Sequence, residues 1–257
     1  MITAGIDVGN QTAKIVLLAG DGVVAHVMVP VAGNARLAAE RGLEQALAAA
    51  GLTRDTIAAA TATGVGRNVV AFATGTASEI SCNAKGAVWL YPEARTVVDI
   101  GAENFRGSTC DDLGDVVDFV TNDKCAAGVG SFLEAMAKAL EVSLAEMGPL
   151  SLRSTKELGI STTCAVFAES EVISLVHRGL SKVDILRGIH DSIASRTSSA
   201  LMRIGVEEQV VMVGGVAKNV GVVESLQRML GFEVTVPDNP HIIGALGAAL
   251  RARNGNS

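Results

Sequence analysis

The chain is poor in aromatic side chains, in cysteine and in positive charge. Aromatic residues make up 3% of its 257 residues, whereas apolar residues of all kinds make up 49%. Alanine, valine and glycine therefore supply most of the apolar surface. Such small side chains favour the close packing of helices on a sheet that is typical of α/β proteins. The length suffices for a sizeable core in one large domain or two small ones.

What the sequence lacks also excludes several classes of function. A net charge of −6 leaves no basic face for nucleic acid. No apolar run reaches the roughly 18 residues that span a membrane. The first residues, MITAGIDVGN, lack the basic start of a signal peptide, so we expect a cytoplasmic protein. Its four cysteines would then stay reduced, which argues against a disulfide framework.

Predicted strands and helices alternate along the chain in two similar series. The first series has strands over 3–7, 14–18, 23–29 and 57–61 and helices over 34–50 and 78–89. The second has strands over 96–100, 104–108, 116–120, 209–213 and 232–236 and helices over 130–140, 165–177, 182–204, 220–230 and 244–253. This order indicates an internal duplication, and a cleft between the two halves is a natural ligand site.

Each series opens with a strand that ends in an acidic residue, any residue and glycine. In the first turn, Gly9 lets the backbone approach a ligand, and successive N–H groups there can hold phosphate oxygens. Thr12 adds a hydroxyl and Lys14 a charge, while Asp7 suits Mg²⁺. One such turn alone is also a common structural β-turn. A second at Asp99 makes a clamp on a triphosphate and its metal more specific.

A third glycine turn, at Gly214 and Gly215, joins a predicted strand to a helix. Glycine there allows a purine or ribose to lie against the backbone, although a tight packing turn is the alternative. The turn is neither a Walker A loop nor a G-x-G-x-x-G fingerprint. The three turns in this order resemble the actin, sugar kinase and Hsp70 superfamily of ATPases. That resemblance implies a duplicated, ribonuclease H-like α/β fold of two lobes with a nucleotide cleft between them.

Cys125 and Cys164 each directly precede a predicted helix. A helix N-terminus favours a thiolate and anionic cargo such as a [4Fe–4S] cluster, which needs four ligands. A symmetric dimer would supply these two cysteines twice. The alternatives are buried apolar thiols, or a cluster held by all four cysteines of one chain. Cys82 and Cys110 have no such placement and are interpreted as structural.

The histidines show no metal-binding spacing. They are His26, His177, His190 and His241. His177 and His190 fall on the predicted polar faces of two helices, which favours a structural interpretation. A Gly-x-Ser-x-Gly elbow is absent, so a serine hydrolase has no support.

A series of longer motifs carries a family resemblance. In chain order they are GIDVGNQTAKIVLL, SEISCNAKGA, VVDIGAENFRG, NDKCAAGVGSFLE, CAVFAESEV, GGVAKNVGVV and VP(x)5-IGALGAAL. Together they cover nearly the whole chain and resemble the activator ATPases of 2-hydroxyacyl-CoA dehydratases, a family that includes the ATPase subunits of benzoyl-CoA reductases. The resemblance implies that residues 1–94 with roughly 238–257 form one lobe and residues 95–237 the other.

The resemblance also implies a cofactor and partners. Cys125 and Cys164 from each of two subunits would hold one [4Fe–4S] cluster, in a homodimer or in a heterodimer with a paralogous ATPase subunit. Binding and hydrolysis of ATP with Mg²⁺ would drive a low-potential electron into an iron–sulfur dehydratase or reductase that acts on a CoA thioester. Reduced ferredoxin or flavodoxin would supply the electron. No nucleic acid or membrane is expected as a partner.

By the same resemblance, specific residues would surround ATP. The phosphates and Mg²⁺ would contact Asp7, Gly9, Asn10, Gln11, Thr12 and Lys14 from the first half and Asp99, Gly101, Ala102 and Glu103 from the second. The ribose and adenine side would comprise Gly128, Gly130, Glu134, Gly214, Gly215 and Lys218. Asp7, Asp99 and Glu103 are the expected catalytic residues.

The sequence departs from the family pattern in the second turn. The family has DIGGQD, whereas this chain has Glu103 in place of the glutamine and Asn104 in place of the second aspartate. Asn83, Val129 and Ser131 replace a usual histidine, threonine and arginine. These changes are typical of the less active member of an ATPase pair, so a weakly hydrolytic subunit is one alternative. A small-molecule kinase of the same superfamily is another.

Overall fold

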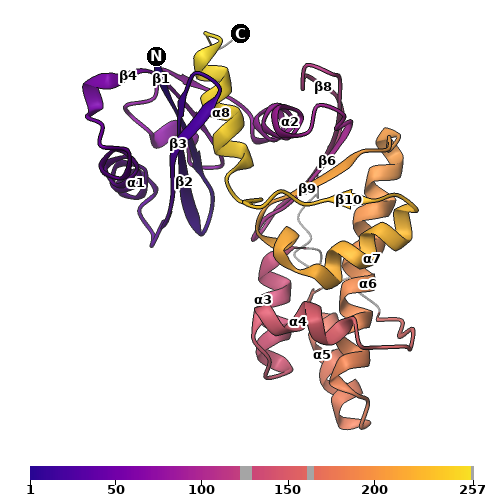
Figure 1. The fold of residues 1–257 in the computed structure, drawn as a ribbon. Helices are drawn as coiled ribbons and strands as arrows, with labels where there is room; N and C mark the ends of the chain where they lie inside the picture. The colour runs from indigo at the N-terminus through magenta and orange to yellow at the C-terminus, as the bar shows by residue number, and fades with distance from the viewer. Residues whose placement is uncertain (122–128, 161–164, 256–257) are drawn as a thin grey trace. The chain divides into compact units, whose positions relative to one another are not determined.

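The computed structural model describes residues 1–121, 129–160 and 165–255, and the chain divides into two compact units (Figure 1). The first comprises Met1–Val97, Cys110–Val117 and Asp238–Ser257, and the second comprises Val98–Thr109 and Asp118–Pro237. In the described parts of the chain, no helix is both long and apolar enough to cross a membrane.

The first unit is built on a five-stranded sheet in the order β3-β2-β1-β4-β5. Its strands are β1 (Ile2–Val8), β2 (Thr12–Ala19), β3 (Gly22–Pro30), β4 (Ile57–Thr63) and β5 (Gly75–Thr76). The first three strands form an antiparallel meander, and β4 joins β1 in parallel. The hairpin register sets Asp7 directly opposite Lys14, which brings a carboxylate and an ammonium to one end of the sheet.

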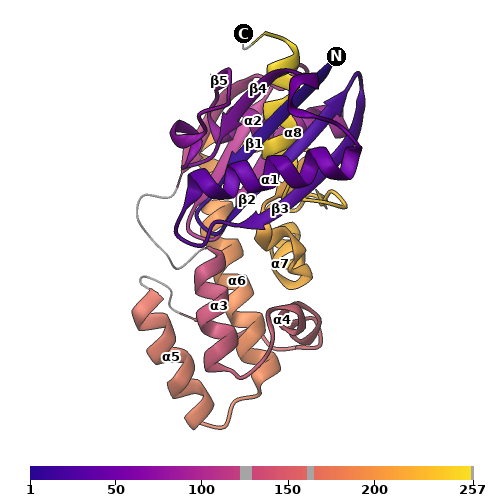
Figure 2. The same cartoon turned by 90° about the vertical axis from the view of Figure 1, so that its left-hand side faces the viewer.

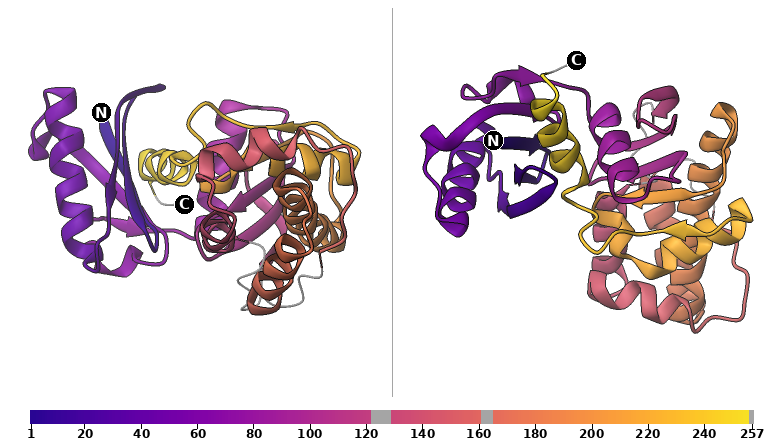
Figure 3. Two further views of the ribbon diagram at one scale, coloured as in Figure 1. Left: turned by 90° about the horizontal axis from the view of Figure 1, so that it is seen from below. Right: turned by 45° about the horizontal axis from the view of Figure 1, so that its top comes forward.

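Helices cover both faces of this sheet. On one face lies α1 (Ala35–Ala50), which begins at the Asn34 cap and ends at Gly51 in a left-handed conformation. On the other face lies α8 (Ile243–Arg253), with α2 (Glu79–Leu90) packed against it (Figure 3). Side chains of β2 alternate between the two layers: Ile15 packs with α1, whereas Val16 packs with α8.

Glycines allow α8 to lie very close to β1 and α2. A Cβ at Gly5 would overlap the carbonyl oxygen of Ala245, and one at Gly247 would overlap that of Cys82. Because backbone atoms form these contacts, a side-chain rotation cannot relieve the overlap. The small-residue composition of the sequence is therefore used where a helix crosses the central strand.

We expect a Gly247→Ala substitution to lower the free energy of unfolding by about 2–4 kcal/mol, because the added methyl group forces α8 away from α2. Urea denaturation followed by circular dichroism measures this loss. The matched control in the same unit is Gly22→Ala, since the nearest described atom to a Cβ there is 3.7 Å away. Equal stabilities of the two variants would show that the close packing of α8 is not needed.

The second sheet has the order β10-β9-β6-β7-β8, which repeats the order of the first sheet when read in reverse. Its strands are β6 (Thr96–Ile100), β7 (Phe105–Cys110), β8 (Val116–Thr121), β9 (Val210–Val213) and β10 (Val234–Thr235). In both sheets, three successive strands are followed by a strand from later in the chain on the inner side. The predicted duplication is thus confirmed by the strand order.

The helices of the second unit enclose its core. They are α3 (Gly130–Ala139), α4 (Leu144–Ser151), α5 (Ala165–His177), α6 (Lys182–Leu201) and α7 (Val220–Leu230). Helix α6 supplies buried Ile185, Ile189 and Ile193 to that core. The predicted helix over 182–204 continues beyond α6 only as the 3₁₀ turn Met202–Ile204. Helix α3 packs against α5 (Figure 2).

Helix α4 was not predicted from the sequence. It has eight residues and includes Pro149, and both features weaken a periodicity signal. A local signal was nevertheless present, because Ser143 and Glu146 form a capping box at its start. The omission matters for the environment of His190, because α4 covers the face of α6 on which this histidine lies.

Candidate nucleotide-binding site

The turn between β1 and β2 presents an acidic side chain beside a basic one. The backbone N–H of Gly9 donates to the carbonyl of Thr12 at 3.0 Å and closes the turn. Lys14 Nζ lies 3.1 Å from Asp7 Oδ2, and the two side chains are 16% and 14% exposed. Asn10 and Gln11 are exposed at the tip of the turn. The turn therefore offers a carboxylate, an ammonium and backbone groups to a ligand.

The turn between β6 and β7 repeats this arrangement in the second unit. The N–H of Gly101 donates to the carbonyl of Asn104 at 2.8 Å. Arg106 lies 3.4 Å from Asp99 Oδ2, and each side chain is 14% exposed. In both turns the basic residue follows the acidic one by seven positions. Sequence reasoning missed Arg106, although its spacing from Asp99 matches that of Lys14 from Asp7.

A glycine in a left-handed conformation supports each acidic residue. Gly64 follows β4 with φ of +89°, and a Cβ there would lie 2.6 Å from Asp7 Oδ1. Gly214 follows β9 with φ of +85°, and a Cβ there would overlap Asp99 Oδ1 and lie 2.6 Å from the carbonyl oxygen of Ile100. Gly214 was predicted as a site residue, whereas Gly64 was missed. The Gly-Val-Gly motif after the predicted strand 57–61 was the available signal.

Two further residues lie close to Asp7 in the first unit. A Cβ at Gly244 would lie 3.0 Å from Asn83 Oδ1 and 3.6 Å from Asp7 Oδ2. Asn83 comes from α2 and is buried, so an uncharged amide occupies this position beside the acidic turn. Burial raises the pKa of the neighbouring Cys82 thiol to about 11, so that thiol stays protonated and unreactive.

The start of α3 is bonded to the second turn. The N–H of Gly130 donates to the carbonyl of Gly101 at 2.9 Å, and the N–H of Ser131 donates to that of Ala102 at 2.8 Å. A Cβ at Gly130 would lie 3.1 Å from the Gly101 oxygen, so glycine suits this close approach. The structure thus brings Gly101, Ala102 and Gly130 together, and any movement of the turn would be transmitted to α3.

The remaining predicted residues fall into two groups. Exposed side chains or backbone are found at Glu103 in the second turn, at Glu134 on α3, and at Gly215 and Lys218 in the 3₁₀ turn Gly215–Lys218. Outside the described residues lie Cys125, Gly128 and Cys164. Among the described residues, no cluster of three or more histidine, cysteine or acidic side chains is arranged to hold a metal. Cys82 and Cys110 are buried, as expected of structural thiols.

The prediction that His190 lies on a polar helix face was wrong. His190 is fully buried on α6, between α4 and the start of α7. The helical periodicity around residue 190 is polar, but those polar groups bond to one another in the interior rather than to water. Burial lowers the pKa of His190 to about 4, so the ring is neutral at pH 7.

Residues 4–252 match the BadF/BadG/BcrA/BcrD ATPase family. This chain belongs to that family. The chain is 47% identical to the activator of lactoyl-CoA dehydratase of Anaerotignum propionicum, over 98% of this chain and 97% of the relative. It is 37% identical to one of the subunits of benzoyl-CoA reductase from Thauera aromatica, over 97% of this chain and 92% of that protein. The family resemblance of the sequence motifs is thereby confirmed.

Solved structures of the family show the same fold. The activator of the 2-hydroxyisocaproyl-CoA dehydratase from Clostridium difficile, solved with bound ADPNP, matches with a TM-score of 0.92 at 44% identity and covers 99% of this chain and 95% of that chain. A ROK family glucokinase from Streptomyces griseus matches with a TM-score of 0.63 at 11% identity, which indicates a common fold alone. The predicted two-lobed α/β ATPase fold is therefore confirmed.

Proposed function

We propose that this chain is an ATP-driven activator that delivers a low-potential electron from a [4Fe–4S] cluster, shared by two subunits, to an iron–sulfur dehydratase or reductase acting on a CoA thioester. The observation that carries the proposal is the repeated acidic turn, with Asp7 and Lys14 in one unit and Asp99 and Arg106 in the other. The activator names of the related proteins support the same conclusion.

The proposed nucleotide is ATP with Mg²⁺. Carboxylate oxygens are hard ligands that suit Mg²⁺, and Asp7 and Asp99 both retain partial exposure beside a cation. The backbone of Gly9 to Thr12 and of Gly101 and Ala102 would contact phosphate oxygens, and Lys14 would offset their charge. Gly214, Gly215 and Lys218 would line the ribose and adenine. Glu103 would act on the attacking water, as an exposed carboxylate next to the second turn.

The proposed cluster ligands are Cys125 and Cys164, two from each subunit. A bound [4Fe–4S] cluster supplies a one-electron couple. Helix α3 starts shortly after Cys125 in the sequence, and α5 starts directly after Cys164. Because Gly130 of α3 bonds to Gly101 of the second turn, a change at the γ-phosphate would move α3 relative to α5. This contact supports coupling between the nucleotide and the cluster.

The proposed partners follow from the same scheme. Reduced ferredoxin or flavodoxin would return one electron to the protein for each electron passed to the CoA-thioester enzyme. The two subunits would be identical or paralogous. A second candidate function is a weakly hydrolytic subunit of a heterodimeric ATPase pair, and the observation that favours it is Glu103 in place of the family glutamine.

Anaerobic purification of the wild-type chain tests the proposal. We expect a brown protein with about four iron atoms per dimer, and a Cys125→Ser variant with little iron that keeps its affinity for ATP. Cys110→Ala is the control, because that buried thiol should not affect the iron content. A wild-type protein without iron after reconstitution would contradict the cluster. Rapid hydrolysis of ATP by the chain alone would exclude the weakly hydrolytic alternative.

A further inference from the structure

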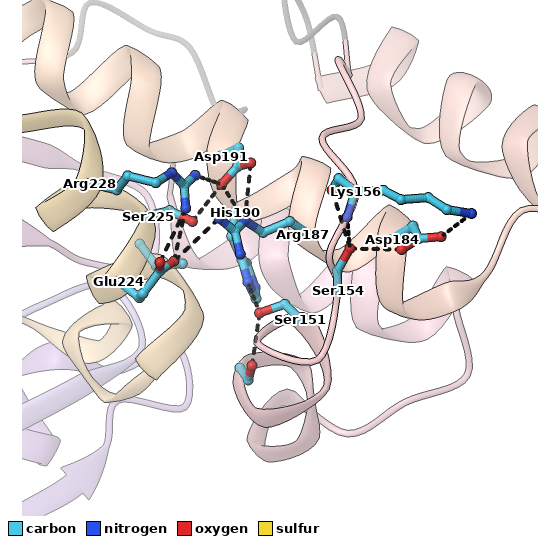
Figure 4. A network of polar contacts seen from close by, with 12 residues as sticks. Ser151, Ser154, Lys156, Asp184, Arg187, His190, Asp191, Glu224, Ser225 and Arg228 are labelled. Atoms are coloured by element: carbon cyan, nitrogen blue, oxygen red, sulfur yellow. Dashed lines mark hydrogen bonds and ion pairs between the residues drawn. The ribbon is translucent and has the colours of Figure 1, made fainter.

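A buried histidine joins three helices of the second unit. His190 on α6 has a fully buried side chain. Its Nδ1 lies 2.9 Å from Ser151 Oγ at the end of α4, and its Nε2 lies 3.1 Å from Asn219 Nδ2 at the start of α7. Figure 4 shows His190 pointing toward Ser151, apart from the ion pairs of Asp191 on the same helix. Both ring nitrogens therefore have partners.

The hydrogen bonds of the two neighbours determine which nitrogen carries the proton. Ser151 Oγ donates to the carbonyl of Gly148 at 2.8 Å, so it accepts from His190 Nδ1–H. Asn219 Oδ1 accepts from the N–H groups of Gly221 and Val222, so its amide nitrogen donates to His190 Nε2. The ring is therefore the neutral Nδ1–H form. The lowered pKa of His190 agrees with this form.

Two glycines allow the three helices to approach closely enough for these bonds. A Cβ at Gly221 would overlap Ser151 Oγ and His190 Nδ1. A Cβ at Gly148 would lie 2.9 Å from Asn219 Oδ1. The space around the ring is thus filled by its polar partners and by glycine backbone. Such a fit indicates a built polar network rather than a polar residue that happens to be covered.

Asn219 connects this network to the proposed nucleotide-binding turn. Its backbone N–H donates to the carbonyl of Val216 at 2.9 Å and closes the 3₁₀ turn Gly215–Lys218. The same residue caps α7 through its side chain. At the other end of the turn, Gly214 packs against Asp99 and Ile100. The turn is therefore held at one end by the acidic turn and at the other end by Asn219.

We propose that His190 is a positioning residue for ATP, which orients Asn219 and so sets the conformation of the turn Gly215–Lys218. The inference rests on the proposed function, because that turn is assigned to the ribose and adenine. Without an acceptor at Nε2, the buried amide of Asn219 would lack a partner, and it would rotate away from the start of α7 to find one. The turn would then lose its fixed end.

Kinetics of anaerobically purified protein test this role. We expect His190→Leu to raise the KM for ATP by about tenfold with a change in kcat below about twofold, because binding is affected rather than chemistry. His190→Gln should restore most of the affinity, since its amide offers one donor and one acceptor. The matched control is Ser225→Ala. It removes a buried bond to Asp191 at 2.7 Å between the same two helices but leaves Asn219 untouched.

The outcomes separate the role of His190 from general stability and from the proposed function. A folded His190→Leu protein with the wild-type KM would overturn the proposal, as would an equal rise of KM in Ser225→Ala. Should His190→Leu fail to fold, the milder Ser151→Ala removes only the Nδ1 partner and should raise KM about threefold; an unchanged KM there would also overturn the proposal. If the wild type binds no ATP in calorimetry, the proposed function itself fails.

Discussion

An Asp7→Asn substitution should lower the ATPase rate by at least about 100-fold while the free energy of unfolding changes by less than about 1 kcal/mol. Asparagine has nearly the same shape as aspartate, so the contact with Gly64 and the hairpin register are retained. The negative charge beside Lys14 is lost, and with it the proposed hard ligand for Mg²⁺. The loss therefore falls on metal-dependent catalysis rather than on folding.

Steady-state hydrolysis at several Mg²⁺ concentrations measures this effect, and the Mg²⁺ dependence should weaken with the rate. Asp21→Asn is the matched control, because this exposed carboxylate of the same unit contacts only Arg253 and the backbone nearby among the described interactions. We expect the control to hydrolyse ATP at the wild-type rate. Undiminished hydrolysis by Asp7→Asn would remove the first acidic turn from the proposed site.

A Gly214→Ala substitution should weaken ATP binding by at least about tenfold and lower the free energy of unfolding of the second unit by about 3 kcal/mol. Two costs combine at this position. The φ of +85° disfavours any side chain, and the added methyl group would overlap the carboxylate of Asp99 and press on the carbonyl of Ile100. The second acidic turn would have to move, which changes the proposed phosphate contacts.

Calorimetric titration with ATP, together with urea denaturation, separates these two costs. The matched control is Gly205→Ala, since Gly205 also has a positive φ, of +72°, but open space among the described residues around it. The control carries the conformational cost alone, about 1–2 kcal/mol, and should bind ATP like the wild type. If both variants bound ATP equally well, contact between Gly214 and Asp99 would not matter for the nucleotide.

Much of the fold could be predicted because its signals are local. The bounds predicted for β6, α5 and α7 agree with the structure at both ends. Runs of β-branched residues mark β6, and a cap residue and a terminal glycine mark α7. The short β10 was predicted too long, because pairing with β9 covers only two of its residues. Strand length thus depends on a partner that local sequence does not specify.

By itself, the sequence determined the duplicated hairpins, the glycine turns and the family of this protein, since these depend on residues close together along the chain. Only the tertiary structure decided that Gly64 supports Asp7, that Arg106 lies beside Asp99, and that His190 is buried. Each of these facts depends on which elements pack together. A polar helix face is exposed or buried according to what covers it, and α4, which covers the face of α6 that carries His190, has too weak a periodicity to be predicted.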